Sequence, residues 1–342
     1  MRFLLDDEQR EFTRTLDAML SAADTPAAVR AWGAGDHGPG RALWARLAEA
    51  GVFALAIPEA YGGVGPLPVE LAASFVELGR HAIPGPVVET VAAAVLLDGV
   101  GGPAAKEWLP RMASGAVTVT LRPADGAYAL DADAADAVFA VSRDELRLAS
   151  GHGPLRASSD PARRLFRVGP GGQLLASGPR VAEAAGAAAD WAAFVTAAQA
   201  LGTGEALLRA TVGYVKQRTQ FGVAIGSFQA VKHRLADTLI GLEFARPLLY
   251  GAAVALAEGA PRAGADVAAA KVAAGEAAYA ASRAALQLHG AVGYTDELDL
   301  SVWLRKAGPL RTAWGAPGVL RARVVGTDAA PGDNGTAAGG DR

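Results

Sequence analysis

The chain has 342 residues, of which 51% are hydrophobic and 20% charged, so it is long and apolar enough for two or three packed layers or domains. Its formal net charge of -3 argues against nucleic-acid binding, because no domain-wide basic field is available to displace counterions. The absence of cysteine excludes thiol nucleophiles, disulfide frameworks and cysteine-ligated metals.

The first residues, MRFLLDDEQREF, are too acidic for a signal peptide, which begins with a basic stretch and continues into an apolar run. No stretch reaches the roughly 18 uninterrupted strongly apolar residues of a membrane span. We therefore expect a cytoplasmic protein without a membrane-spanning segment.

Helical periodicity dominates the chain up to about residue 115. Apolar residues recur at helical spacing at Phe3, Leu5, Phe12, Leu16 and Leu20, and again at Leu43, Leu47 and Val52. The segment AIPEAYGGVG, 56–65, contains a proline and a glycine pair and is predicted to be a loop. Helices are predicted to resume in PVELAASFVELGR and VVETVAAAVLLDG.

The pattern changes between about 116 and 180, where short, partly alternating apolar runs are separated by Gly, Pro and Asp. The predicted strands are AVTVTL, YAL, AVFAVS, LRLAS and RLFRV. A segment of this length holds only a small sheet.

From residue 181 onward the chain is Ala-rich and helical. Phe228, Val231, Leu235 and Leu239 form one apolar stripe of a long helix that begins near Ser227. Two more helices are predicted over 263–290 and 298–325. The predicted fold is mainly α with a small β domain, and its parts are an N-terminal helical domain (1–115), a shortened β domain (116–180), a C-terminal helical bundle (181–326) and a disordered tail (327–342).

The segment RTQFGVAIGSFQAVKHRLAD, 218–237, suggests an anion-binding function. A guanidinium is permanently charged and grips a phosphate with two parallel donors, so Arg218 suits such a ligand. Alone, Arg218 is equally explained as a surface cation, and Phe221 and Phe228 as core residues. His289 has no partners at metal-ligand spacing, and no metal site is predicted.

Four motifs resemble those of the acyl-CoA dehydrogenase family, in the family's order and over residues 1 to about 326. LLDDEQREF resembles the family's opening helix, and IPEAYGG (57–63) its Pro-Glu-x-x-Gly-Gly loop. RTQFG and the helix after it resemble the family's Arg-x-x-Phe-Gly segment. QLHGAVGYT (287–295) resembles its Gln-x-x-Gly-Gly-x-Gly-Tyr signature, with Ala291 in place of the second Gly.

The resemblance implies two helical domains flanking a β domain, the C-terminal one a four-helix bundle. It also implies FAD-dependent oxidation of the Cα–Cβ bond of an acyl-CoA thioester, with electrons passed to an electron-transferring flavoprotein. In such proteins the Arg and the Gln/Gly segment touch the FAD held mainly by a neighbouring subunit. Carried over by position, Arg218 would pair with the pyrophosphate, and the other cofactor-binding residues would be Phe221, Phe228, Gln229, Gln287, Gly290 and Ala291.

The catalytic base of the family has no counterpart here. Removal of an α-proton requires a positioned carboxylate, yet Trp314 occupies the position of the family's Glu in its Tyr-Glu-Gly-Thr turn. The alternative position, on the helix before Arg218, holds Ala192. Asp190 lies some 200° around a helix from Ala192 and should point elsewhere, and Glu205 lies more than three turns on.

The β segment also departs from the family. Arg122 stands where the resemblance places a Glu, and no Trp lies between 109 and 190. The residues that would hold this chain's own flavin ring are thus reduced, whereas those that would contact a neighbour's FAD remain. The first hypothesis is a subunit that completes the FAD site of a base-bearing paralogue, as in some bacterial heterotetramers. The alternatives are a self-sufficient flavoenzyme with an unrecognised base, and a non-catalytic scaffold or acyl-CoA-binding remnant without flavin.

Overall fold

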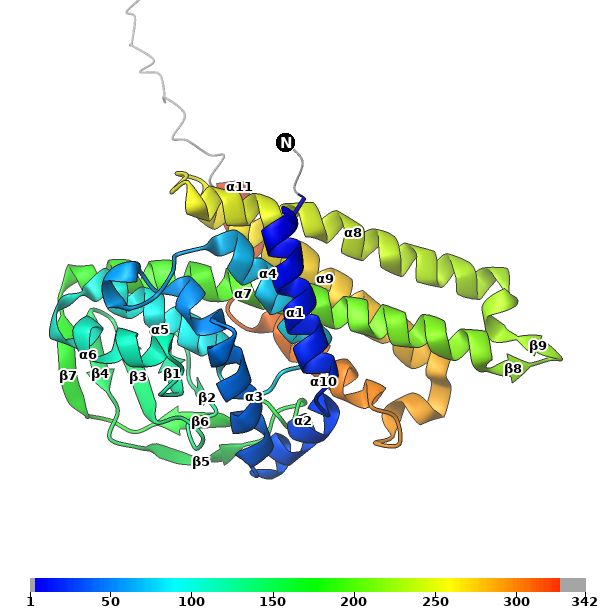
Figure 1. Cartoon of the computed structure of the whole chain (residues 1–342), viewed down its shortest axis with the longest axis horizontal. Helices are drawn as coiled ribbons and strands as arrows, with labels where there is room; N and C mark the ends of the chain where they lie inside the picture. The colour runs from blue at the N-terminus through cyan, green and yellow to red at the C-terminus, as the bar shows by residue number, and fades with distance from the viewer. Residues whose placement is uncertain (1–3, 327–342) are drawn as a thin grey trace, which may run out of the picture.

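Two helical regions flank a strand region in the computed structural model, which describes residues 4–326 (Figure 1). The mainly helical fold with a small β part is confirmed. Phe3 and the predicted tail, 327–342, lie outside the described residues, and the domain boundaries stay predictions.

The N-terminal helices begin with a capping box, in which the Asp6 carboxylate accepts from the Gln9 N–H and the Gln9 side chain accepts from the Asp6 N–H. The predicted loop 56–65 contains only short 3-10 turns. The elements are α1 (Asp7–Ser21), α2 (Thr25–Ala34), α3 (Gly38–Glu49), η1 (Val52–Ala56), η2 (Glu59–Tyr61), α4 (Pro68–Arg80), α5 (Val87–Val100) and α6 (Gly102–Ala113).

The strands form a four-stranded sheet, β1-β3-β4-β7, and a three-stranded sheet, β2-β6-β5. Only the β1–β3 pair is parallel among the strand pairs of these two sheets. The strands are β1 (Val119–Arg122), β2 (Ala129–Leu130), β3 (Ala137–Ser142), β4 (Glu145–Leu148), β5 (His152–Arg156), β6 (Leu165–Val168) and β7 (Gln173–Ser177). The sequence did not predict β5 and β7, because both are largely exposed and lack an alternating apolar face.

The C-terminal helices pack around α9, which contacts α7, α8, α10 and α11 (Figure 1). The prediction of one helix over 298–325 is wrong, since the chain breaks at Trp314 and Gly315, which have φ values of 53° and 130°. The elements are α7 (Pro179–Gln217), β8 (Thr219–Gln220), β9 (Val223–Ala224), η3 (Ile225–Ser227), α8 (Gln229–Ala257), α9 (Ala263–His289), η4 (Gly290–Tyr294), α10 (Leu300–Thr312) and α11 (Pro317–Gly326).

Glycines allow α4 and α7 to approach closely at the centre of the molecule. A Cβ added to Gly202 would lie 1.9 Å from the Val76 carbonyl oxygen, and one added to Gly79 would lie 2.1 Å from the Gln199 carbonyl oxygen. Both helices therefore need glycine at their crossing. This packing fixes the N-terminal helices against the bundle that carries the predicted site residues.

Helix α8 differs from α7 and α9 in how much of its apolar surface is exposed. Its outward side chains include Leu239, Ile240, Phe244 and Leu248, of which Phe244 is 72% exposed. Within the described part of the chain, α8 is the one helix that length and composition would allow to cross a membrane, a test that core helices of soluble proteins also pass. We call these four residues the α8 stripe.

Candidate functional site

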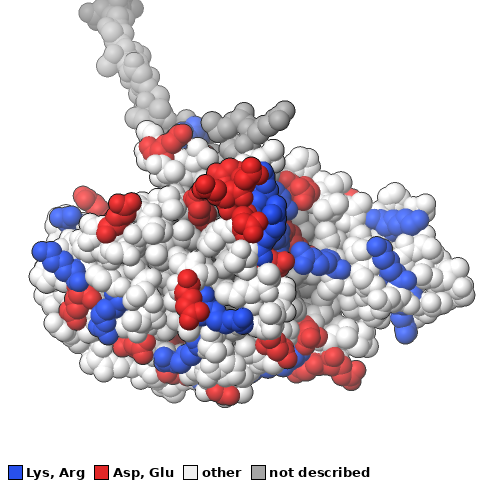
Figure 2. Space-filling view, viewed as in Figure 1, with Lys and Arg blue, Asp and Glu red and all other residues white. Residues whose placement is uncertain are grey.

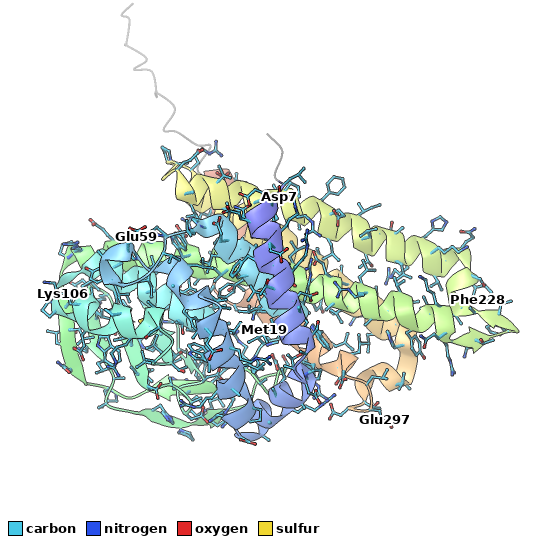
Figure 3. All side chains as sticks on the ribbon, in the orientation of Figure 1. Asp7, Met19, Glu59, Lys106, Phe228 and Glu297 are labelled. Carbon is cyan, nitrogen blue, oxygen red and sulfur yellow. The ribbon has the colours of Figure 1, made fainter. Side chains whose placement is uncertain are left out.

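The β8–β9 hairpin holds Arg218 at the end of α7. The Arg218 N–H donates to the Tyr214 carbonyl at 2.9 Å, and its own carbonyl accepts from the Ile225 N–H at 2.8 Å, so the backbone is fixed while the side chain is exposed. The tip of the hairpin is tight, because Phe221 and Gly222 have φ values of 53° and 81°. The hairpin projects beyond the bundle, with Phe228 nearby (Figure 3).

A second predicted segment, at the end of α9, is brought to the same end of the bundle. The His289 ring stacks on Tyr214 with the ring centroids 4.1 Å apart, and this contact joins the end of α9 to that of α7. Arg234 of α8 donates to the Gln287 Oε1 at 3.0 Å. Gly290 follows with a φ of 63° and is exposed, as is Ala291. The structure therefore gathers the predicted segments 218–229 and 287–291.

This end of the molecule is basic and apolar. Between 206 and 236 the chain has no acidic residue, and its cations are Arg209, Lys216, Arg218, Lys232 and Arg234. Figure 2 shows basic side chains among uncharged surface there. Phe221 is 90% exposed and lies edge-on to Phe228, with the centroids 6.2 Å apart. These aromatic residues are thus surface residues, and core packing does not explain them.

The predicted cofactor-binding residues fit a ligand that joins a diphosphate to aromatic rings. No hydrogen-bond or ion-pair partner of the Arg218 guanidinium lies among the residues that the structure describes. A Cβ built on Gly222 or Gly290 meets no atom within 4 Å, so the backbone at both positions is open to an approaching group. Aromatic faces at Phe221 and Phe228 would suit flat rings.

Trp314 lies in the sharp turn between α10 and α11. Gly315 has a φ of 130°, a conformation that residues with a Cβ rarely adopt, so glycine is favoured there. The preceding end of α10 is held by the buried Lys271 of α9, whose ammonium donates to the Leu310 and Arg311 carbonyls at 2.8 and 3.2 Å. Burial lowers the pKa of Lys271 to about 7. Trp314, a bulky residue, has a φ of 53° in this turn. A left-handed backbone is energetically costly for such a residue.

The Trp314 indole borders two neighbouring cavities, of about 360 and 260 Å³. Its N–H donates to the Glu89 Oε1 of α5 at 3.1 Å. Asp190 and Arg323 also line the larger cavity and form an ion pair with Nη2 and Oδ2 2.8 Å apart. We call this larger space the Trp314 cavity.

The two predicted base positions differ in their relation to this cavity. Trp314 lines it, whereas Ala192 is completely buried and is not among its lining residues. Asp190 points away from Ala192, as the helical angle predicts. It nevertheless lines the Trp314 cavity. Its carboxylate is held by Arg323.

Glu89 is the residue at this site that the sequence reasoning missed. It is 3% exposed, and burial raises the pKa of its carboxyl, with Arg163 as the strongest opposing influence. The available signal was a single acidic residue inside the apolar run PVVETVAAAVLL. An acidic residue in a run of that kind is rarely buried without a partner, and here the partner is Trp314.

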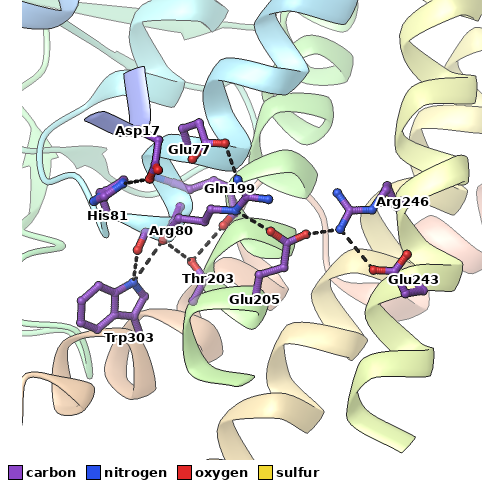
Figure 4. A network of polar contacts seen from close by, with 11 residues as sticks. Asp17, Glu77, Arg80, His81, Gln199, Thr203, Glu205, Glu243, Arg246 and Trp303 are labelled. Atoms are coloured by element: carbon purple, nitrogen blue, oxygen red, sulfur yellow. Dashed lines mark hydrogen bonds and ion pairs between the residues drawn. The ribbon is translucent and has the colours of Figure 1, made fainter. Parts of the chain in front are cut away.

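Glu205, the other acidic residue considered as a base, lies in a separate ionic network. It accepts from Arg80 at 2.6 Å and from Arg246 at 2.7 Å (Figure 4). It is not among the residues that line the Trp314 cavity. Arg122 is also engaged in its own turn, where it donates to the Pro123 and Gly126 carbonyls.

Sequence matches to known families cover both helical regions. Residues 6–116 match the family model for the N-terminal domain of acyl-CoA dehydrogenase, and residues 182–326 match that for its C-terminal domain. Acyl-CoA dehydrogenase IpdE2 of Mycobacterium tuberculosis is 37% identical over 304 residues, which cover 88% of this chain and 91% of the relative. Acyl-CoA dehydrogenase FadE34 of the same organism is 32% identical over 83% of this chain and 42% of its own length.

Solved structures share the fold over nearly the whole chain. Butyryl-CoA dehydrogenase from Megasphaera elsdenii superposes with a TM-score of 0.83 at 22% identity, over 96% of this chain and 99% of that one. A chain of the ChsE4-ChsE5 complex from Mycobacterium tuberculosis gives a TM-score of 0.82 at 25% identity, over the same shares of the two chains. The arrangement of helices and sheets is therefore one that these proteins have in common.

Proposed function

The chain belongs to the acyl-CoA dehydrogenase family, and we propose that it is a subunit that completes the FAD site of a base-bearing paralogue. Proteins of this family are FAD-binding flavoproteins and oxidoreductases that act on acyl-CoA thioesters. The proposal assigns this chain the contacts to FAD at Arg218 and at the end of α9, and assigns the catalytic base to the partner.

The observation that carries the proposal is the outward presentation of the cofactor-binding residues. Arg218, Phe221 and Gly290 are exposed at one end of the bundle. The α8 stripe starts at Leu239, ten residues into the helix that follows the β8–β9 hairpin. Contiguous exposed apolar surface is typical of a protein interface. A partner covering the stripe would bring its own cofactor against Arg218.

The turn at Trp314 also supports a partner chain, and not this chain, as the source of the catalytic base. An indole has only an N–H to donate and cannot accept an α-proton, and the Trp314 N–H is already bonded to Glu89. Its side chain also occupies space between the two cavities. On this proposal the pocket of the present chain does not turn over substrate.

Bound FAD would supply the acceptor for the hydride removed from the acyl chain. The residues of this chain would bind and orient the FAD. Arg218 would hold the pyrophosphate with two donors, the open backbone at Gly290 would admit a phosphate oxygen or ribose closely, and Phe221 and Phe228 would shield the adenosine portion from water. Gln229 and Gln287 would add amide contacts, and Ala291 a close backbone approach.

The partners that follow are a paralogous acyl-CoA dehydrogenase chain, an acyl-CoA substrate and an electron-transferring flavoprotein as the electron acceptor. ChsE4 and ChsE5 form a complex, and a chain of that complex shares this fold. The α8 stripe is the surface that we assign to the paralogue.

A second candidate function, a self-sufficient enzyme, is favoured by one observation. Glu89 is a carboxylate that lines the Trp314 cavity, and it would be the base that the sequence did not reveal. Burial raises the pKa of Glu89, and the Trp314 hydrogen bond is one of the influences that oppose this rise. Under this alternative, activity would depend on Glu89 and would need no second chain.

We expect Arg218→Ala to weaken FAD retention in the assembled complex by about 10- to 100-fold. A charge-assisted bidentate contact contributes on the order of 1.5–3 kcal/mol, and the alanine variant removes it without disturbing the backbone bonds that fix the hairpin. Flavin content after extensive dialysis, followed by its visible absorbance, is the measurement.

Two variants control this experiment. Lys216→Ala removes an exposed positive charge two residues away and should leave retention unchanged, whereas Arg218→Lys keeps the charge but loses the two-pronged geometry and should give an intermediate loss. Full retention in Arg218→Ala would mean that this residue is only a surface cation.

A further inference from the structure

We propose that Asp17, Glu77 and His81 form a binding site for a divalent transition-metal ion, with Zn²⁺ as the best match. Each residue offers one ligand atom, and these atoms lie within 4.8 Å of one another. Glu77 and His81 are one turn apart on α4 and its C-terminal cap, so they share a face. Asp17 reaches them from α1 (Figure 4).

The second observation is an unpartnered oxygen on Glu77. One carboxylate oxygen of Glu77 pairs with Arg80, whereas its Oε2 is buried and has no hydrogen-bond partner among the described residues. The residue is only 3% exposed. Leaving an ionised oxygen buried without a partner is costly. A cation on the side of Asp17 and His81 would satisfy it.

The geometry of the other two donors suits a small ion. The His81 Nε2 and the Asp17 Oδ1 share a hydrogen bond of 2.9 Å, which a bound ion would replace. Two ligands at zinc-bond lengths of about 2.0–2.1 Å in a tetrahedral site are roughly 3.3 Å apart, so only a small shift of the two side chains is needed. The Asp17 side chain is 46% exposed and gives the ion a route from solvent. Three protein ligands leave one position for water.

The chemistry of the donors selects the ion. Imidazole favours zinc and other transition metals, whereas magnesium and calcium prefer sites made of oxygen alone. The surrounding charge also favours a cation, because carboxylates outnumber guanidinium groups in the connected network. The carboxylates are Asp17, Glu77, Glu205 and Glu243, and the guanidinium groups near them are Arg80, Arg209 and Arg246.

Sequence reasoning predicted no metal site because Asp17 lies far along the chain from Glu77 and His81, with no local motif to link them. The site would tie α1 to α4. It uses neither the Trp314 cavity nor the Arg218 segment, so it stands independently of the proposed function.

The test uses the full chain produced without an oligohistidine tag, stripped with a chelator and titrated with ZnCl₂ by calorimetry. We expect one Zn²⁺ per chain, and we expect Asp17→Asn and His81→Gln to lower the affinity at least tenfold, about the loss that even outer-shell partners cause. Two controls, Glu11→Gln on α1 and His233→Gln on α8, each remove an exposed group and should change nothing. Circular dichroism verifies that each variant folds.

Cobalt provides a readout on the unsubstituted protein. Co²⁺ bound by nitrogen and oxygen at this site should give a visible absorption that Zn²⁺ displaces and that Asp17→Asn lacks. The proposal is overturned if the stripped wild-type chain takes up no stoichiometric Zn²⁺, or if Asp17→Asn and His81→Gln bind it as tightly as the wild type does.

Discussion

Gly202→Ala is expected to destabilise the protein by about 2–3 kcal/mol, although alanine is the better helix former. The added Cβ would lie 1.9 Å from the Val76 carbonyl oxygen. That oxygen belongs to the backbone of α4 and cannot turn aside as a side chain would, so the two helices must separate. Differential scanning calorimetry should record a fall of several degrees in the unfolding midpoint.

Gly186→Ala, in the same helix, is the matched control. A Cβ at Gly186 meets no atom within 4 Å, so this substitution should be neutral or stabilise the protein by up to about 1 kcal/mol. Equal midpoints for the Gly202 and Gly186 variants would show that α4 and α7 do not pack as described.

A loss of about a thousandfold in turnover is expected when the partner's catalytic Glu is changed to Gln in the co-expressed complex. A positioned general base contributes about 10²- to 10⁴-fold to such a reaction. Trp314→Ala in the present chain should leave turnover nearly unchanged, apart from a packing loss, because its pocket is not the one that reacts. Dye-coupled turnover at saturating substrate, with FAD content verified for each variant, is the measurement.

The two proposed functions separate in the same assay. Glu89→Gln should leave turnover unchanged if the partner holds the base, and should reduce it by two orders of magnitude or more if Glu89 is the base. Trp314→Phe keeps an aromatic ring but removes the hydrogen bond to Glu89, and so distinguishes filling of space from polar support. A thousandfold fall in Trp314→Ala with FAD retained would contradict the partner-subunit account.

Local sequence was sufficient for most of the helices, but not for the region 298–325, where two helices replace the one predicted. Long helices with regular apolar spacing are recognisable from sequence, and the tight turn of the β8–β9 hairpin is marked by its glycine. The contact that joins the two cofactor segments could not be predicted in this way. It depends on Tyr214 stacking on His289 across two helices, a long-range contact with no signature in either segment.

The surroundings of Trp314 were the least predictable part. The apolar spacing over 298–325 led to a prediction of one helix, although Gly315, Pro317 and Gly318 in the sequence are signals for a turn and a new helix start. Glu89 likewise depends on tertiary structure, because its importance comes from a donor 225 residues away. The helical angle predicted that Asp190 points away from Ala192, and so away from the expected position of the base. The Trp314 cavity lies on the side to which Asp190 points.

Flavin absorbance of the purified chain, alone and co-expressed with a paralogue that carries the Tyr-Glu-Gly-Thr turn, tests the central claim most directly. The residues that would hold this chain's own flavin ring are reduced, whereas those that would contact a neighbour's FAD remain. The chain alone should therefore hold little or no FAD, and the complex should retain FAD stably. A stoichiometric flavin spectrum from the lone chain, retained on dialysis, would contradict the account.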